Sequence, residues 1–256
     1  MPRLRWSLLV IAVVLLATPA LGQGATPSQK RKNADAAVDR NIIFSSAETI
    51  NKGALTINSY ELFLLGLTYG FSNDFQGSFT TLLPITADFP LTMMFSGKWQ
   101  FLNTGKILVS LQPNFGFMTQ EGDTLGGFGI GIAADFIVDD DGEYVFTLSE
   151  TNMMLFGNVG SDGVLSDGVA FAVAAGFTAR VARAVKLLVE MSVPGAAVWD
   201  RGDFELFPEG TLFSYGVRFF GETVAVDLSF LRPIHPDADA GFLVMGFPYL
   251  TFSARF

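Results

Sequence analysis

The chain ends with the stretch Tyr249-Leu250-Thr251-Phe252-Ser253-Ala254-Arg255-Phe256. From Leu250 onward, apolar side chains alternate strictly with polar ones, and the last residue is aromatic. Side chains of a β-strand point alternately to opposite faces, so this stretch predicts a strand with one apolar and one polar face. Such a strand suits either a sheet half-buried against a core or a barrel wall that faces lipid.

The first 22 residues predict a secretory signal peptide that is removed. Arg3 and Arg5 precede an apolar run over residues 6–17 that carries no charge. Ala20-Leu21-Gly22 places small residues at the two positions that a signal peptidase reads, which predicts cleavage after Gly22. An uncleaved anchor is the alternative, but the apolar run is shorter than the roughly 20 residues that a spanning helix needs.

Composition narrows the class of protein further. The chain has no cysteine, which excludes a lipoprotein signal and a disulfide framework. Without the two arginines of the signal peptide, 14 basic and 25 acidic residues remain, and this net charge of about −11 argues against a nucleic-acid partner. Half of the chain is apolar, with 26 Phe. These residues form either a soluble core or the lipid-facing surface of a closed barrel, which besides the helix is the structure that can span a membrane.

Beyond the signal peptide, the pattern predicts a flexible periplasmic tail over residues 23–40 and an all-β domain over residues 41–256. The tail is polar and of mixed charge, whereas strand-like segments and turn signals alternate from residue 41. Single-chain bacterial barrels have an even number of strands, and we expect about twelve, within roughly 10 to 14. The segments are 41–48, 54–71, 75–84, 91–102, 106–118, 126–138, 143–155, 167–181, 185–193, 210–220, 223–232 and 241–256, of which the first is the weakest.

The connections between these segments are of two kinds. Short ones at 72–74, 103–105, 139–142, 182–184 and 221–222 alternate with longer ones around 85–90, 119–125, 156–166, 194–209 and 233–240. Short periplasmic turns and longer outer loops are typical of outer-membrane barrels. With both termini in the periplasm, only the short connection at 49–53 falls on the outer side. The sequence therefore predicts a transmembrane antiparallel up-and-down β-barrel.

Aromatic residues gather on the predicted outer face near the periplasmic ends of the strands. Rings at the lipid headgroup level form girdles in such barrels, so we predict a girdle here. Its members are Tyr69, Phe71, Trp99, Phe101, Tyr144 and Phe219. The abundance of Phe is an alternative explanation, and Tyr69, Trp99 and Tyr144 are the stronger evidence.

Charged residues recur at inward-facing positions of the predicted strands. We predict a lumen charge cluster made of Lys98, Asp135, Arg180, Lys186, Glu190, Arg218, Asp227 and Arg255. One interpretation is an ion-pair network that braces and plugs a narrow barrel. The other is a charged constriction that selects solutes. The predicted outer loops are acidic and could hold divalent cations that bridge lipopolysaccharide.

The sequence offers little that points to an enzyme, a cofactor or a metal. Its one histidine, His235, lies near Asp237 and Asp239 in a proline-rich loop, where a surface turn is the simpler reading than a catalytic pair. The run Asp139-Asp140-Asp141-Gly142 resembles part of a calcium loop but lacks the later Glu at the required spacing. We therefore predict no catalytic residues, no cofactor and no metal, and keep an outer-membrane hydrolase as the last alternative.

Several blocks resemble uncharacterised small outer-membrane β-barrels of Gram-negative bacteria. They are the strand–turn–strand unit 69–75, the stretch 216–219 and the C-terminal stretch 246–256. In that family the last strand, with a terminal Phe, is the signal for barrel assembly, which here falls on Leu250, Phe252 and Phe256. The resemblance implies an outer-membrane location with both termini periplasmic. Its implied partners are outer-membrane lipid, lipopolysaccharide and the barrel-assembly machinery.

Strand number limits the function. Eight strands leave an interior that side chains fill and 16–18 leave a water channel, so twelve permits either a narrow pore or a plugged barrel. The leading hypothesis is a narrow, passive, porin-like channel for small polar or charged solutes. The second is a non-conducting structural or surface-interaction barrel that acts through its acidic extracellular loops.

Overall fold

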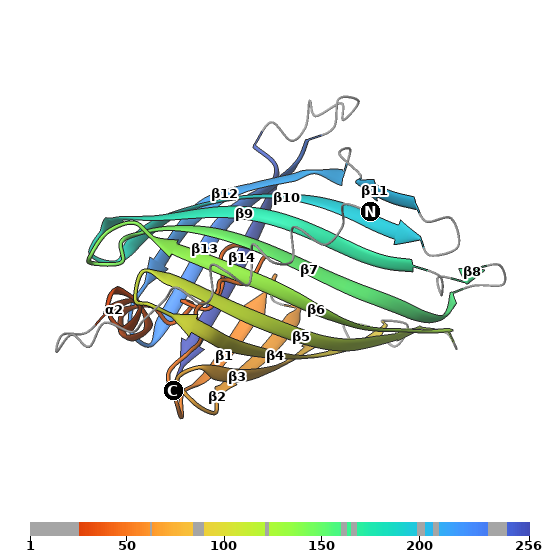
Figure 1. The fold of residues 1–256 in the computed structure, drawn as a ribbon, viewed down its shortest axis with the longest axis horizontal. Helices are drawn as coiled ribbons and strands as arrows, with labels where there is room; N and C mark the ends of the chain where they lie inside the picture. Colours follow the sequence, from red (N-terminus) through yellow and green to blue (C-terminus); the bar gives the residue numbers. More distant parts are fainter. Residues whose placement is uncertain are drawn as a thin grey trace, which may run out of the picture.

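The computed structural model describes residues 26–61, 63–83, 90–120, 123–159, 163–164, 168–198, 203–206, 210–234 and 245–256. In this part of the chain, twelve antiparallel strands close into a barrel (Figure 1). They are β1 (Leu55–Tyr60), β2 (Leu64–Gly70), β3 (Phe75–Leu82), β4 (Leu91–Asn103), β5 (Ile107–Gln120), β6 (Asp123–Ile137), β7 (Tyr144–Val159), β9 (Gly168–Ala182), β10 (Val185–Val198), β12 (Leu212–Phe220), β13 (Val224–Pro233) and β14 (Phe247–Arg255). Closure comes from the pairing of β1 with β14, which opposes Thr56 to Arg255. The predicted antiparallel barrel is confirmed.

Two short strands extend the wall beyond the twelve. β8 (Gly163–Val164) pairs with the end of β7, and β11 (Asp203–Leu206) pairs with the end of β10. The strands that these two extend are long, and β7 has 16 residues. At the longer connections, the ends of β7 and β10 reach well past the ends of β1–β3.

The structure divides the first part of the barrel differently from the prediction. Residues 41–48 form no strand, and the predicted segment 54–71 is a hairpin of β1 and β2. Glu61, with a φ of +51°, lies in the turn, and Tyr60 pairs with Leu64 across it. Because this register joins odd residues to odd residues, the same parity faces outward on both strands. Alternation alone therefore could not reveal the turn. The predicted number of twelve strands agrees with the structure, but the predicted strand 41–48 is replaced by the division of 54–71 into β1 and β2.

Polarity follows the alternation along each strand. In β13, Asp227 and Ser229 are buried in the interior while Leu228 between them is 50% exposed on the outside. Large apolar side chains are exposed in this way around the outer wall, whereas most buried wall residues are polar or small. Such an inside-out distribution is what a lipid-facing barrel requires.

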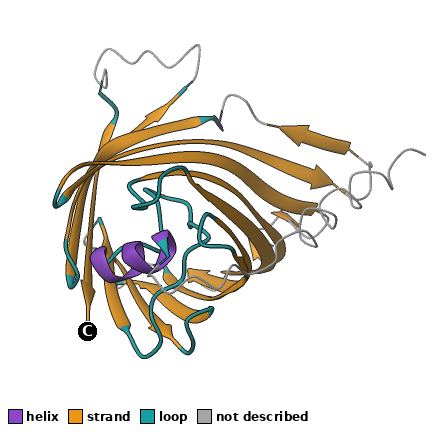
Figure 2. Cartoon of the chain, turned by 60° about the vertical axis from the view of Figure 1, so that its left-hand side comes forward, coloured by secondary structure: helices purple, strands orange, loops and turns teal. Residues whose placement is uncertain are grey.

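The segment before β1 lies inside the barrel (Figure 2). We call residues 26–54 the plug segment. It begins with helix α2 (Pro27–Ala34) and continues without further helix or strand to β1. This corrects the predicted flexible tail over 23–40, as far as the structure describes it, and moves the start of the barrel from residue 41 to Leu55. A polar segment need not be solvated, because the polar interior of the barrel offers it hydrogen-bond partners in place of water.

Local signals explain the helix. Thr26 caps its N-terminus by accepting a hydrogen bond from the backbone N of Gln29, at 3.2 Å, and proline occupies the first turn. Asp35, in extended conformation, ends it. Among the described residues, no helix is long and apolar enough to cross a membrane.

Two small apolar contacts join the plug segment to the wall. Ala47 packs with Leu108 and Ala133, and Ala36 and Ala37 pack with Phe220 and Ala225. These clusters are small for a domain core, so most of the contact between plug and wall is polar.

Candidate functional site: a plugged lumen

Charged side chains from the plug segment and from the wall are buried together in the lumen. Six come from the plug segment, three basic and three acidic: Arg31, Lys32, Asp35, Asp39, Arg40 and Glu48. Six come from the wall, again three of each sign: Lys98, Asp135, Lys186, Glu190, Arg218 and Asp227. Each set is neutral in formal charge, and four of the seven buried ion pairs join a residue of one set to a residue of the other.

Asp35 is the centre of one group of contacts. It is fully buried, and its carboxylate contacts Nζ of Lys186 at 2.5 Å and Nη1 of Arg218 at 3.5 Å. Burial raises the pKa of the Asp35 carboxyl, but Lys186 and Arg218 outweigh burial and hold that pKa below its usual value. Asp35 is therefore ionised, and its charge joins the end of α2 to β10 and β12.

Arg218 extends this group to β13 and β14. Its guanidinium forms a bidentate pair with Asp227, at 2.7 and 3.0 Å, and donates to the backbone oxygens of Ala37 and Asn41. Asp227 also accepts from Nη1 of Arg40 at 2.9 Å and from the hydroxyl of Thr251 at 2.9 Å. Planar, two-pronged contacts of this kind are the strong ones among charged hydrogen bonds.

Glu48 is the centre of a second group. It accepts from the Ser28 hydroxyl at 2.9 Å and contacts Lys32 at 3.4 Å and Arg31 at 3.6 Å. Burial raises the pKa of the Glu48 carboxyl, and Arg31 and Lys32 only partly oppose this effect. Arg31 also lies 3.6 Å from Asp135, so it bridges the plug segment to the wall.

The wall charges also hold the backbone of the plug segment. Nζ of Lys98 donates to the backbone oxygens of Asp39 and Glu48, at 2.6 and 2.9 Å. The carboxylate of Glu190 accepts from the backbone N of Ile43 and of Phe44, both at 3.2 Å. Buried backbone groups need such partners, and the plug segment lacks a helix or sheet to supply them over residues 36–54.

The two remaining members of the predicted lumen cluster lie at its edge. Arg180 is partly exposed at the turn after β9, where it donates to the backbone oxygen of Arg183 and lies 3.8 Å from Glu143. Arg255 is half-buried and donates to the backbone oxygens of Lys32 and Asp35. The structure thus brings six of the eight predicted residues into the buried network and leaves these two at its rim.

Sequence reasoning missed the half of the network that the plug segment supplies. Residues such as Arg31, Asp35 and Glu48 lay in a stretch predicted to be a tail or a weak first strand. One signal pointed to them: a stretch of mixed charge directly precedes a barrel with inward-facing charges of both signs.

The other predicted residues fall as follows. All six girdle residues are exposed on the outer wall, and Leu250, Phe252 and Phe256 lie on the outer face at β14. Their roles at the membrane interface and in assembly stay predictions. His235 lies outside the described residues.

The Asp139 carboxylate accepts from the backbone N of Asp141, Glu143 and Tyr144, so it closes the β6–β7 turn. Within the described ranges, no group of three His, Asp or Glu is placed to hold a metal.

Space remains in the lumen beside and above the plug segment. A polar pocket of about 150 Å³ is lined by Arg40, Tyr60 and Lys98 among others. A second cavity of about 420 Å³ is lined by Met94, Ser96, Asn114, Met153 and Ala172 among others, and none of its described lining residues is charged. The charged residues therefore cluster at the plug segment, and the uncharged cavity lies beyond it.

No protein-family model matches the chain, and no curated protein sequence matches it. Solved structures do match. An outer-membrane channel from Pseudomonas putida F1 shares 12% identity and a TM-score of 0.54, over 82% of this chain and 98% of the other. The KdgM porin shares 8% identity and a TM-score of 0.47, over 79% and 98%. Outer-membrane expressed OmpT of Vibrio cholerae shares 12% identity and a TM-score of 0.42, over 75% and 64%.

These likenesses bear on the fold alone. The chain spans 62% to 64% of the length of the three OmpT chains that it matches. Identity is low for the Pseudomonas channel, the KdgM porin and OmpT alike, and of these the Pseudomonas channel has a TM-score above 0.5. The protein has the fold of an outer-membrane β-barrel.

Proposed function

We propose that the protein is an outer-membrane channel of a Gram-negative bacterium, held closed by its plug segment, with both termini in the periplasm. The channel passes small polar or charged solutes when the plug segment leaves the lumen. The observation that carries this proposal is the network of twelve buried charges, half on the plug segment and half on the wall.

The chemistry of this contact favours a plug that can leave. A permanent core is apolar throughout, whereas here ion pairs and hydrogen bonds lie beside the buried apolar side chains of Val38, Ile42 and Ile50. Such groups lose little when water replaces their partners, since protein–water contacts stand in for protein–protein contacts. The polar contact is therefore reversible at moderate cost.

Departure of the plug segment would leave Lys98, Asp135, Lys186, Glu190 and the Arg218–Asp227 pair on the wall of a wet lumen. Rings of charged side chains of this kind select among small solutes. The ion-pair network and the charged constriction are thus two states of the same residues.

A non-conducting barrel that acts through its acidic loops is the second candidate. It is favoured by the buried ion pairs that join Asp35 and Arg40 to the wall, which would suit a permanent brace equally well. The two candidates differ in whether the plug segment ever leaves.

A reversible lock tests this difference. A Cβ on Gly105 would lie 3.3 Å from Cβ of Thr26, so a small shift brings the two to the roughly 3.5–4.5 Å of a disulfide, although the φ of +86° at Gly105 makes a cysteine there strained. The chain has no cysteine of its own. The double variant T26C/G105C would tether the plug segment to the β4–β5 turn at its free end. The single variants T26C and G105C are the controls, because they carry the same substitutions without the tether.

The measurement is conductance in planar bilayers. We expect discrete openings from the wild type, silence from the oxidised double variant, and openings again after reduction. If the wild type and the reduced double variant are both silent, the channel proposal fails and the non-conducting barrel stands. Openings that oxidation leaves unchanged would show that the plug segment does not close the pore.

A further inference from the structure

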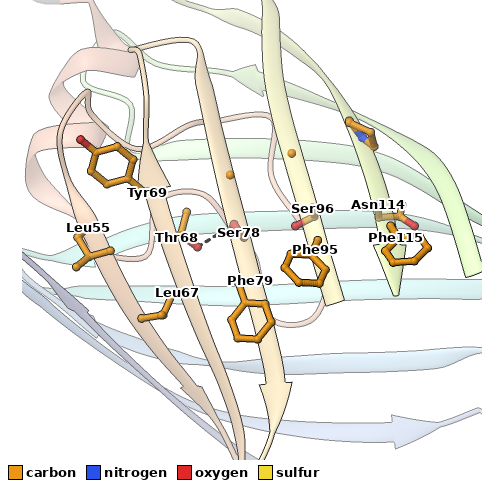
Figure 3. Close-up of a pocket in the computed structure, with 13 residues that line it drawn as sticks. Leu55, Leu67, Thr68, Tyr69, Ser78, Phe79, Phe95, Ser96, Asn114 and Phe115 are labelled. Atoms are coloured by element: carbon orange, nitrogen blue, oxygen red, sulfur yellow. Dashed lines mark hydrogen bonds between the residues drawn. The ribbon is translucent and has the colours of Figure 1, made fainter. Parts of the chain in front are cut away.

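The outer wall over β2 to β5 carries a groove (Figure 3). Four outward residues, one on each strand, lie side by side: Tyr69 pairs with Gly77, Gly77 with Gly97, and the position of a Cβ on Gly97 is 3.4 Å from Cγ of Pro113. Two glycines in such a row remove the side chains that would otherwise cover the strands. The groove that remains has a volume of about 520 Å³.

Apolar residues border this groove. Figure 3 shows Leu67, Phe79, Phe95 and Phe115 in a row across the four strands, and the rings of Phe79 and Phe95 are 5.0 Å apart. None of the described residues that line the groove is charged. Its chemistry suits an uncharged, apolar molecule, which would lose contact with water there at no electrostatic cost.

One backbone hydrogen bond between β4 and β5 is missing beneath the same groove, although the register is the same on both sides of it. Pairing of β4 with β5 is continuous up to Ser96 with Asn114 and resumes at Trp99 with Leu111. Alternation from the turn, where Ile107 accepts from the backbone N of Thr104, directs the nitrogen of Pro113 toward β4. Proline has no N–H to donate, so the seam lacks a backbone hydrogen bond at Gly97.

The lumen reaches this seam from the inside. Ser96 and Asn114 line both the outer groove and the uncharged lumen cavity of about 420 Å³. Thr68 and Ser78, which share a hydrogen bond of 2.9 Å, line both the groove and the polar pocket beside the plug segment. At Gly97 and Pro113 one layer of backbone separates the two spaces, and on the outer side the rings of Pro113 and Phe75 lie 3.4 and 3.6 Å from the Cβ position of Gly97.

We propose that the seam between β4 and β5 at Gly97 and Pro113 is a lateral passage, through which small uncharged, largely apolar molecules leave the lumen for the membrane. The proposal rests on the proposed function in one respect, that solute enters the lumen from the loop side. It goes beyond that function because this route works with the plug segment in place. The ligand class follows from the lining: neither the uncharged cavity nor the groove offers a partner to a charge.

The test is uptake of N-phenyl-1-naphthylamine, an uncharged aromatic dye that fluoresces on reaching a bilayer, by intact Gram-negative cells that produce the full chain. Two variants close the seam in different ways. Gly97→Leu covers its outer mouth, and a Cβ there makes only ordinary contacts, the nearest at 3.4 Å. Pro113→Val restores the missing donor without filling the groove. Ala175→Leu is the matched control, since Ala175 faces outward on β9, away from the groove.

We expect faster uptake with the wild type than with empty cells, and the same rate with Ala175→Leu. Pro113→Val should slow uptake about fivefold, the factor that one backbone hydrogen bond represents, and Gly97→Leu should return it to the rate of empty cells. Assembly of each variant is checked by its heat-modifiable migration on gels. Wild-type rates in both seam variants would overturn the proposal.

The outcomes separate this proposal from the channel itself. Dye uptake no faster than in empty cells, together with bilayer conductance, would sink the lateral passage and leave the channel standing. Uptake that depends on the seam, by a protein that shows no conductance, would support the lateral passage and contradict the channel. Seam-dependent uptake that persists in the oxidised T26C/G105C variant would show that the route does not need plug release.

Discussion

Replacing Asp35 by asparagine should open the proposed channel. Asp35 is the one carboxylate through which the end of α2 reaches both Lys186 and Arg218, and it is fully buried. Asp35→Asn keeps the size of the side chain and removes its charge. Lys186 would then be buried in the closed state without a carboxylate in contact, because no other ion pair is found for it among the described residues.

The magnitude follows from the cost of an unpaired buried charge. Breaking a buried pair by removing one partner costs about 3–5 kcal/mol. Because 1.36 kcal/mol is a factor of ten, the ratio of open to closed states should rise roughly 10²- to 10⁴-fold. We expect the lower end, since the amide still accepts hydrogen bonds and Arg218 keeps its pair with Asp227. In the open state Lys186 is hydrated, so the cost falls on the closed state alone.

The assay is the open fraction in single-channel records. Asp141→Asn is the matched control: it removes the same charge from another contact between plug and wall, the pair of Lys30 with Asp141 at 2.7 Å. Both partners of that pair are exposed, so water screens it and the open fraction should barely change. The double variant Asp35→Asn/Lys186→Met removes the unpaired cation as well and should restore much of the closure.

Equal open fractions for the wild type and a folded Asp35→Asn variant would refute the reasoning. So would equal effects of Asp35→Asn and Asp141→Asn, because burial would then not decide the strength of the contact.

Three further predictions concern pH, assembly and export. The pKa of Glu48 is raised when the plug segment is docked, so the contribution of Glu48 to docking is fully present below its ordinary value of 4.5 and is lost as pH rises through the raised pKa. The open fraction should therefore grow as pH rises above 4.5, and Glu48→Gln should flatten this dependence. Deleting Phe256 should lower the amount of heat-modifiable, folded barrel in outer-membrane fractions, since it belongs to the predicted assembly signal, whereas an equal amount would contradict that role. Amino-terminal sequencing of the mature protein should begin at Gln23 if the signal peptide is cleaved after Gly22, and a start at Met1 would show an uncleaved anchor.

Prediction from sequence succeeded where the signal is local. Alternation with a period of two is set by the geometry of each strand, so the wall and the inward positions of Lys98, Glu190 and Asp227 followed from residues a few places apart. It failed at the β1–β2 hairpin for an equally local reason, because the turn at residues 61–63 preserves the parity of the outward face.

Only part of the candidate site could be predicted from the sequence. Arg40 contacts Asp227 across 187 residues of sequence, and Lys186 contacts Asp35 across 151. No local pattern marks such pairs, and a polar stretch before the first strand has the composition of a solvated segment. Its burial depends on partners that exist only once the barrel has closed around it.

The sequence by itself determined that the chain forms an antiparallel barrel with an apolar outside and charges turned inward, because backbone geometry converts alternation into two faces. Only the tertiary structure decided that the polar stretch before β1 lies inside the lumen, and that the pairing of β4 with β5 lacks a backbone hydrogen bond at Pro113. These features depend on which side chains meet across the barrel, and that is decided by strand pairing and closure rather than by any neighbourhood in the chain.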